Sequence, residues 1–280
     1  MADLLRKFKD LPLAFGAAGL SGEGGGYGFG DISSEDAQRL VKEAFEQGFR
    51  VFDTAPIYGF GLSEERLGLA LKGNEQAFIV SKSGVSWHDN KRVNMTNNRL
   101  ETEKMLGESL KRLKRDYIDL YMIHWPDQNV DIREPMEVLS RAKEQGKIKH
   151  IGLCNTNQTD LELALSIDKV EVVQSQHNFF IRQELEGLVP LLKKHEISFM
   201  GWGRSYDASD ARSWAPWWKS QDHVTRFKIV DELKVLLEGT TLNLLDFAIQ
   251  FSLASEGMSM PLLGYKNVLQ MQNSLKALDK

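Results

Sequence analysis

The sequence predicts an α/β fold, a (β/α)₈ TIM barrel built as a single domain over residues 1–280. Eight apolar runs of strand length recur along the chain, and helical segments separate them. The 280 residues also suffice for such a barrel, which needs roughly 250. Strands that are apolar on both faces and joined by helices form parallel, covered sheets. A doubly wound sheet is the alternative, but eight units favour the closed barrel.

The expected strands and helices alternate in chain order. We expect strands at 11–16, 49–53, 77–82, 118–124, 151–155, 170–174, 197–202 and 258–263. We expect helices at 33–47, 63–72, 100–114, 135–145, 159–167, 184–195, 223–238, 241–253 and 268–278. Ser33 and Ser63 are expected helix starts, and Gly48 and Gly146 are expected to end helices just before strands. The basic run 111–115 follows leucines at helical spacing, which favours a solvated helix face.

Composition excludes several classes of protein. The net charge of -4 argues against a nucleic-acid partner, because proteins bind nucleic acids largely through basic side chains that neutralise the phosphates. Cys154 is the single cysteine, so neither an intramolecular disulfide nor a thiolate-cluster metal site is expected. The histidines are scattered without metal-ligand spacing, and no apolar run reaches the length of a membrane span. We therefore expect no metal and no membrane partner, and a soluble, cytoplasmic protein.

The segment 22–30 is rich in glycine but never shows the Gly-x-Gly-x-x-Gly spacing of a dinucleotide-binding turn. This departure argues against a Rossmann fold. Two interpretations remain open for the segment, a mobile active-site loop or a flexible linker.

Four ionisable residues fall at or just after the ends of three expected strands: Asp53, Tyr58, Lys82 and His124. A tyrosine is a poor acid at neutral pH, since its unperturbed pKa is about 10. A nearby lysine can stabilise the phenolate, and a carboxylate can keep that lysine charged. Each residue alone is more often structural, but together they predict a proton-donating site in which His124 orients a carbonyl oxygen.

These residues lie in motifs that resemble those of the aldo-keto reductases. The matching stretches are Asp53-Thr54-Ala55-Pro56-Ile57-Tyr58-Gly59, Ser81-Lys82-Ser83-Gly84 and Ile123-His124-Trp125-Pro126. The resemblance implies an NAD(P)-dependent oxidoreductase that reduces an aldehyde or ketone, or oxidises the corresponding alcohol or sugar, with Tyr58 as proton donor. NADP(H) is the expected cofactor, NAD(H) is the alternative, and the partner is a small carbonyl or alcohol substrate.

Further residues are expected to bind the cofactor. Asn155 and Gln174 end successive strands and could bond the nicotinamide amide, and Trp202 offers a ring for stacking. The resemblance adds Gly16, Ala17, Asp53, Cys154, Gly203, Arg204, Ser205, Gly264, Tyr265, Lys266, Gln270 and Asn273. The sequence departs from the family pattern at two of these positions. Cys154 replaces a serine, and Gln270 stands where the family often has an arginine for the 2′-phosphate. Lys266 is then the nearest cation, so NADH use becomes more plausible than is usual in the family.

Trp87, Trp125 and Trp214 are expected walls of an apolar substrate pocket, although burial for structural reasons is an equal alternative. Two other functions remain open. One is a cofactor-sensing interaction subunit that resembles the potassium-channel β subunits of this fold. The other is an aldolase in which Lys82 forms a Schiff base. The particular substrate and the oligomeric state stay open.

Overall fold

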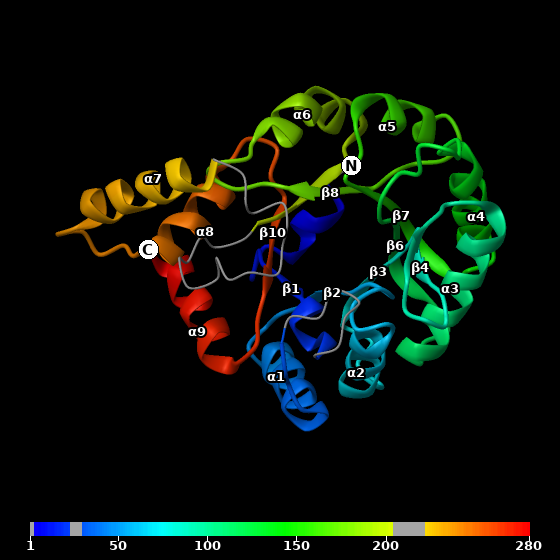
Figure 1. Cartoon of the computed structure of the whole chain (residues 1–280), viewed down its shortest axis with the longest axis horizontal. Helices are drawn as coiled ribbons and strands as arrows, with labels where there is room; N and C mark the ends of the chain where they lie inside the picture. Colours follow the sequence, from blue (N-terminus) through cyan, green and yellow to red (C-terminus); the bar gives the residue numbers. More distant parts are fainter. Residues whose placement is uncertain (1–2, 23–29, 204–221) are drawn as a thin grey trace.

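Eight parallel strands close into a barrel in the computed structural model, which describes residues 3–22, 30–203 and 222–280 (Figure 1). They are β1 (Ala14–Gly16), β2 (Val51–Asp53), β3 (Phe78–Ser83), β6 (Ile118–Ile123), β7 (Ile148–Cys154), β8 (Val172–Gln176), β9 (Ser198–Trp202) and β10 (Met260–Gly264). Barrel strands that follow one another in the chain pair with one another. Strand β1 pairs with both β2 and β10, which closes the barrel. The predicted barrel is confirmed, and each strand overlaps its expected range.

Helices follow the strands and surround the barrel (Figure 1). They are α1 (Ser34–Glu46), α2 (Leu62–Ala70), α3 (Arg99–Leu113), α4 (Arg133–Glu144), α5 (Gln158–Leu165), α6 (Gln183–His195), α7 (Asp222–Leu237), α8 (Leu244–Ala254) and α9 (Val268–Lys276). The expected helices are all present. Helix α7 projects from the body of the molecule, α8 leads back to the barrel at β10, and α9 follows β10 (Figure 1).

Helix ends follow the expected signals at three of the four positions considered. Ser33 caps α1 by accepting a 3.0 Å hydrogen bond from the Asp36 amide, and Gly48 and Gly146 have the positive φ of residues that end helices. The expectation for Ser63 is wrong. Helix α2 begins at Leu62, and the Ser63 hydroxyl instead donates to the Ala17 carbonyl at 2.7 Å, which ties the helix to η2, the 3-10 helix Ala17–Ser21 that follows β1.

The apolar core has two layers, as expected for strands that are covered on both faces. The outer layer lies between strands and helices and includes Phe52, Ile79 and Leu139. The inner layer fills the barrel and includes Met122 and Met200. Because the barrel is packed with side chains, only the loops at its two ends are left to form sites.

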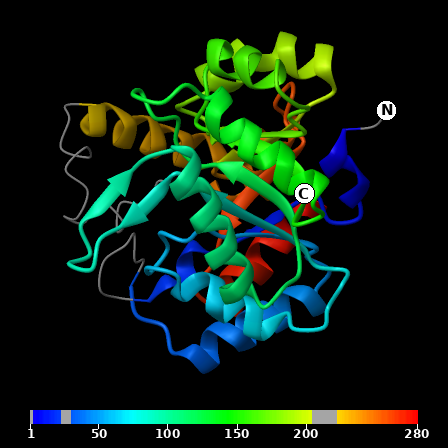
Figure 2. The same ribbon diagram turned by 90° about the vertical axis from the view of Figure 1, so that its right-hand side faces the viewer.

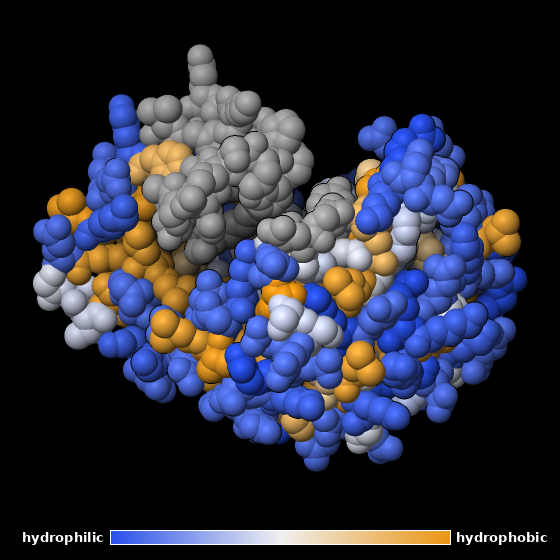
Figure 3. Space-filling model, turned by 60° about the horizontal axis from the view of Figure 1, so that its bottom comes forward, coloured by the Kyte–Doolittle hydropathy of each residue, from blue (hydrophilic) through white to orange (hydrophobic). Residues whose placement is uncertain are grey.

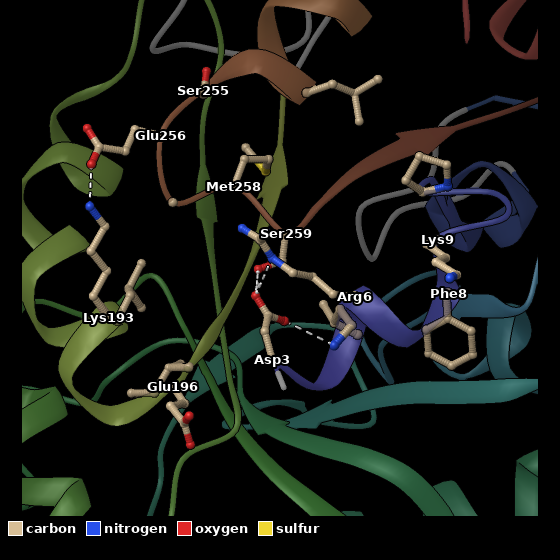
Figure 4. Close-up of a pocket in the computed structure, with 16 residues that line it drawn as sticks. Asp3, Arg6, Phe8, Lys9, Lys193, Glu196, Ser255, Glu256, Met258 and Ser259 are labelled. Atoms are coloured by element: carbon tan, nitrogen blue, oxygen red, sulfur yellow. Dashed lines mark hydrogen bonds and ion pairs between the residues drawn. The ribbon is translucent and has the colours of Figure 1, made fainter. Parts of the chain in front are cut away.

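A short 3-10 helix, η1 (Leu4–Phe8), covers the N-terminal end of the barrel and was not expected from the sequence. Leu5 is fully buried within the inner core layer. The Asp3 carboxylate accepts a hydrogen bond from the hydroxyl of Ser259, just before β10 (Figure 4). It also accepts one from the hydroxyl of Ser198, at the start of β9. A pocket at this end runs between η1, α6 and the residues that precede β10.

An antiparallel hairpin of β4 (Val85–Trp87) and β5 (Val93–Met95) was also not expected. It follows β3 and stands out from the barrel as two short strands, coloured cyan to teal in Figure 2. The strand expected at 77–82 therefore continues, after Gly84, into a separate small sheet.

The described surface is largely hydrophilic, and apolar side chains gather on the side formed by α7, α8 and α9 (Figure 3). Val235, Leu236 and Leu269 are among the exposed apolar residues there. Among the helices that the structure describes, none is both long enough and apolar enough to cross a membrane.

Candidate active site

The four expected catalytic residues gather at the C-terminal end of the barrel. Asp53 is the last residue of β2, and Tyr58 lies in the turn that follows. Lys82 lies in β3, and His124 comes directly after β6. Since β2, β3 and β6 are adjacent parallel strands, their ends meet at one edge of the barrel.

Lys82 and Asp53 form a buried ion pair. Lys82 is fully buried and Asp53 is 2% exposed. The lysine Nζ donates to both carboxylate oxygens, at 2.8 and 2.7 Å, and to the Thr54 carbonyl at 2.8 Å. Burial lowers the pKa of Lys82, but the charge of Asp53, the hydrogen bond to it and the nearby Tyr58 and Cys154 together outweigh burial, so the net pKa lies above the ordinary value. The ammonium is therefore charged at neutral pH, and each of its three protons has an acceptor.

Tyr58 and His124 lie above this pair, half-buried at the mouth of the barrel. The Lys82 Nζ lies 5.6 Å from the centre of the Tyr58 ring. The two aromatic rings meet nearly at right angles, with centroids 6.0 Å apart. Burial, and then the charge of Lys82, lowers the pKa of His124 well below its usual value. The imidazole is thus neutral and donates through one ring nitrogen only.

Gln174 and Cys154 join this network from β8 and β7. The Gln174 Nε2 donates to Asp53 Oδ2 at 2.8 Å, and the Cys154 thiol lies 3.4 Å from the Gln174 Oε1. Burial raises the pKa of that thiol, so it stays protonated and acts as a donor. The Gln174 side chain therefore supports the carboxylate of the ion pair, a contact that the sequence did not suggest.

Asn155 stands beside His124. Its Nδ2 donates to the His124 carbonyl at 3.0 Å, and its backbone has a φ of 51°. The backbone of a non-glycine residue rarely adopts this conformation, and asparagine is among the residues that tolerate it. The bond fixes the end of β7 against the residue that follows β6.

At the same C-terminal end of the barrel, three neighbouring strands end in glycines, whose bare backbone fits a dinucleotide. Gly16, Gly203 and Gly264 lie at the ends of the adjacent strands β1, β9 and β10. A Cβ at Gly16 would lie 3.1 Å from the Leu263 carbonyl, and one at Gly203 would lie 2.8 Å from the His177 carbonyl. A side chain is thus excluded at Gly203 and crowded at Gly16, whereas at Gly264 a Cβ would lie 3.8 Å from the Gly16 carbonyl, an ordinary contact. As glycines, all three leave backbone groups available to an anionic ligand.

The segment after β10 adds a cation at this edge. Lys266 and Gln270 are exposed, and the Gln270 Oε1 accepts from the Lys266 amide at 2.8 Å. Asn273 is exposed on α9. The Tyr265 ring packs against Phe15 and Phe49 in the outer core layer, so its backbone rather than its ring is left to face a cofactor.

The expected tryptophans are placed as follows. Trp125 stacks on His124 with ring centroids 6.3 Å apart, and Trp87 lies in the hairpin, near Phe60. Trp202 is half-buried at the end of β9, against the inner core layer. Ala17 is buried at the end of β1. Arg204, Ser205, Trp214 and most of the glycine-rich segment lie outside the described residues. No group of three His, Cys, Asp or Glu side chains could hold a metal ion within the described part.

A second buried ion pair lies behind the site, and sequence reasoning missed it. Glu64 is fully buried on α2 and accepts from the Arg112 Nε at 2.6 Å. The expectation that 111–115 forms a solvated face is therefore wrong for Arg112, although Lys111 and Lys114 are exposed. The helical spacing of the leucines was interpreted correctly, but nothing in the sequence indicated that Arg112 has a buried partner on another helix.

A comparison of sequences identifies the family to which this barrel belongs. The sequence matches the Aldo/keto reductase family over residues 12–280. The chain belongs to this family. The match extends over nearly the whole chain and includes all four residues of the tetrad Asp53, Tyr58, Lys82 and His124.

Individual aldo/keto reductases resemble parts or all of the chain. Aldo-keto reductase YhdN of Bacillus subtilis is 34% identical over 182 residues, which are 64% of this chain and 55% of that protein. The match thus spans little more than half of the length of YhdN. The NADH-specific methylglyoxal reductase of Escherichia coli is 32% identical over 203 residues, 67% of this chain and 62% of that protein. A Klebsiella pneumoniae aldo/keto reductase, solved with NADP and acetate, has a TM-score of 0.72 at 17% identity and shares the fold over 96% of this chain and 86% of its own.

Proposed function

We propose that this aldo/keto reductase is an NAD(P)H-dependent oxidoreductase that reduces an aldehyde or ketone, or oxidises the corresponding alcohol, with Tyr58 as proton donor. The observation that carries the proposal is the buried, fully bonded Asp53–Lys82 pair beneath Tyr58 and beside a neutral His124. A positive charge held next to a phenol is what turns a weak acid into a usable one.

Each residue has a distinct part in the reaction. The cofactor, when bound, supplies a hydride. Tyr58 gives its phenolic proton to the oxygen of the substrate carbonyl, and the charge of Lys82 stabilises the phenolate that remains. His124 donates one ring N–H to the same oxygen and so fixes its direction. Asp53 keeps Lys82 protonated, and Gln174 holds the Asp53 carboxylate in place.

Lys82 does not suit the Schiff-base alternative. A nucleophilic lysine must be neutral, which requires a lowered pKa. Here the three protons of the ammonium are bonded to Asp53 and Thr54, and the pKa of Lys82 is raised. The contacts favour a permanent cation, so aldolase chemistry is not proposed.

NADPH is the proposed cofactor, with NADH as the alternative. Bare backbone at Gly16, Gly203 and Gly264 and the cation of Lys266 suit the phosphates of either. The Klebsiella structure contains NADP, whereas the Escherichia coli relative is named for NADH. Both cofactors therefore occur among proteins similar to this one.

The proposal is tested by a panel of aldehydes, ketones and sugars, each assayed with NADPH and with NADH. Carbonyl-dependent oxidation of at least one cofactor is expected, at a rate well above that without enzyme. A protein that binds the cofactor tightly but turns over none of the panel would instead support a cofactor-sensing interaction subunit.

Replacing Gln270 with arginine should shift the preference towards NADPH. A guanidinium at this exposed position, next to Lys266, can reach the 2′-phosphate through charged hydrogen bonds worth about 1.5 to 3 kcal/mol. The ratio of NADPH to NADH dissociation constants, measured by titration of tryptophan fluorescence, reports the change. Gln270→Met is the matched control, because it also removes the bond to the Lys266 amide but adds no charge. If both variants changed the ratio alike, Gln270 would not face the 2′ position.

A further inference from the structure

Arg112 lies at a junction of three segments that surround the mouth of the site. It comes from α3, and its side chain is only 16% exposed. Its Nε donates to Glu64 Oε2 at 2.6 Å, and Glu64 belongs to α2, which follows the Tyr58 turn. A buried, charge-assisted hydrogen bond of this kind holds a guanidinium in one orientation.

The carboxylate that holds Arg112 is itself fixed from the barrel side. Glu64 Oε1 accepts a 2.6 Å hydrogen bond from the Ser81 hydroxyl, and Ser81 directly precedes Lys82 in β3. Glu64 is fully buried, so its two bonds replace the water that it loses. Through Glu64 and Ser81, Arg112 is thus held in a fixed position relative to β3, the strand that carries the catalytic lysine.

The aliphatic part of the Arg112 side chain also contacts the loop that contains Tyr58. A Cβ placed on Gly61 would lie 2.7 Å from the Arg112 Cδ and 3.1 Å from its Nε. Only a glycine allows this approach. The arginine therefore packs directly against backbone three residues after Tyr58.

The outer side of the guanidinium faces the hairpin. The Arg112 Cζ lies 5.9 Å from the centre of the Trp87 ring, within the range of cation–π contact. Its Nη2 is buried and has no hydrogen-bond partner among the described residues. The guanidinium is thus bonded to Glu64 through Nε, lies near Glu108 through Nη1 at 3.5 Å, and faces the Trp87 ring within cation–π range.

Trp87 is a principal anchor of the hairpin. On β5, Val93 and Met95 are 38% and 52% exposed, so that strand contributes little burial. On β4, Val85 is buried, and Trp87 also meets Phe60 at 5.3 Å between ring centroids. The base of the hairpin is therefore held by Val85, and the position of its outer part depends on the groups that contact Trp87.

We propose that Arg112 is a positioning residue: held by Glu64, it fixes Trp87 and the β4–β5 hairpin at the mouth of the barrel and thereby sets the width of the substrate opening. The part that concerns substrate rests on the carbonyl-reductase function proposed above. The part that concerns the hairpin does not.

Hydrogen exchange of the full-length protein tests the hairpin without reference to activity. In Arg112→Met, backbone amides of 85–95 should exchange at least about fivefold faster than in the parent protein, the scale of a partly desolvated cation–π contact. Amides of α5, on another side of the barrel, should keep their protection. The double variant Glu64→Gln/Arg112→Met avoids a buried unpaired carboxylate and should show the same loss. Arg141→Met is the matched control, because Arg141 is a half-exposed surface arginine.

Unchanged exchange of 85–95 in the folded double variant would overturn the proposal, whatever the enzyme does. A general loss of protection that includes α5 would also overturn it, since it would show a global effect on stability.

A double-mutant cycle tests the substrate part. Arg112→Met and Trp87→Ala should each change the KM of a bulky aromatic aldehyde more than that of a small aliphatic one. Their combination should change it no further, because both act through one contact. Additive changes in KM would show that Arg112 does not act through Trp87. If the parent protein reduced no carbonyl at all, the function would fail while the exchange experiment would still decide the role of Arg112.

Discussion

Replacing Tyr58 with phenylalanine should lower the rate of carbonyl reduction by at least about 10², the scale of general acid catalysis. The phenyl ring keeps its place above Lys82 and against His124, and only the hydroxyl is lost. Steady-state kinetics with several carbonyl substrates measure the change. Because the ring contacts remain, the dissociation constant of the cofactor should stay within severalfold of its original value.

Tyr117→Phe is the matched control, since Tyr117 precedes β6 at the opposite end of the barrel and contacts Lys149. It removes the same hydroxyl from the same type of residue and should leave turnover as it was. Near-normal turnover by Tyr58→Phe on every substrate would show that another group donates the proton.

Changing Lys82 to methionine should damage both activity and stability. Turnover should fall because the charge that stabilises the Tyr58 phenolate is gone. The free energy of unfolding should fall by about 3 to 5 kcal/mol, because Asp53 would be left buried without its counter-charge. Kinetics measure the first effect, and urea denaturation followed by tryptophan fluorescence measures the second.

The double variant Asp53→Asn/Lys82→Met separates these two effects. An asparagine carries no charge that needs a partner, so the double variant should unfold at higher urea than Lys82→Met and still lack activity. If the losses of stability in Asp53→Asn and Lys82→Met simply added, the two side chains would not be energetically coupled.

The barrel, and the meeting of Asp53, Tyr58, Lys82 and His124 at its C-terminal end, could be predicted because their signals are local. Strand-length apolar runs and helix-ending residues such as Gly48 and Gly146 are visible within a few residues of sequence. Parallel strands then bring their ends together without further information, so Asp53, Lys82 and His124 had to meet once the barrel was assumed. Tyr58 followed from its motif.

The contacts that sequence did not predict join residues distant in the chain through side-chain conformation. Gln174 bonds Asp53 across 121 residues, and Arg112 bonds Glu64 across 48. The spacing of apolar residues and their helix propensity indicate which face of a helix is apolar. They do not indicate which polar group a long side chain on that helix reaches. The β4–β5 hairpin was missed because its strands are short, and β5 is mostly exposed, so neither gives a clear hydrophobic alternation.

The way the barrel closes has a consequence for its synthesis. Strand β1 needs β10 as its second neighbour, and Asp3 bonds Ser259, 256 residues further along the chain. As the polypeptide leaves the ribosome, β1 keeps one open edge until β10, at residues 260–264, has emerged. Such distant pairing makes folding slow, and an open strand edge invites pairing with other chains. A product cut short before residue 260 would keep open edges on β1 and β9, so aggregation is the expected fate of incomplete chains.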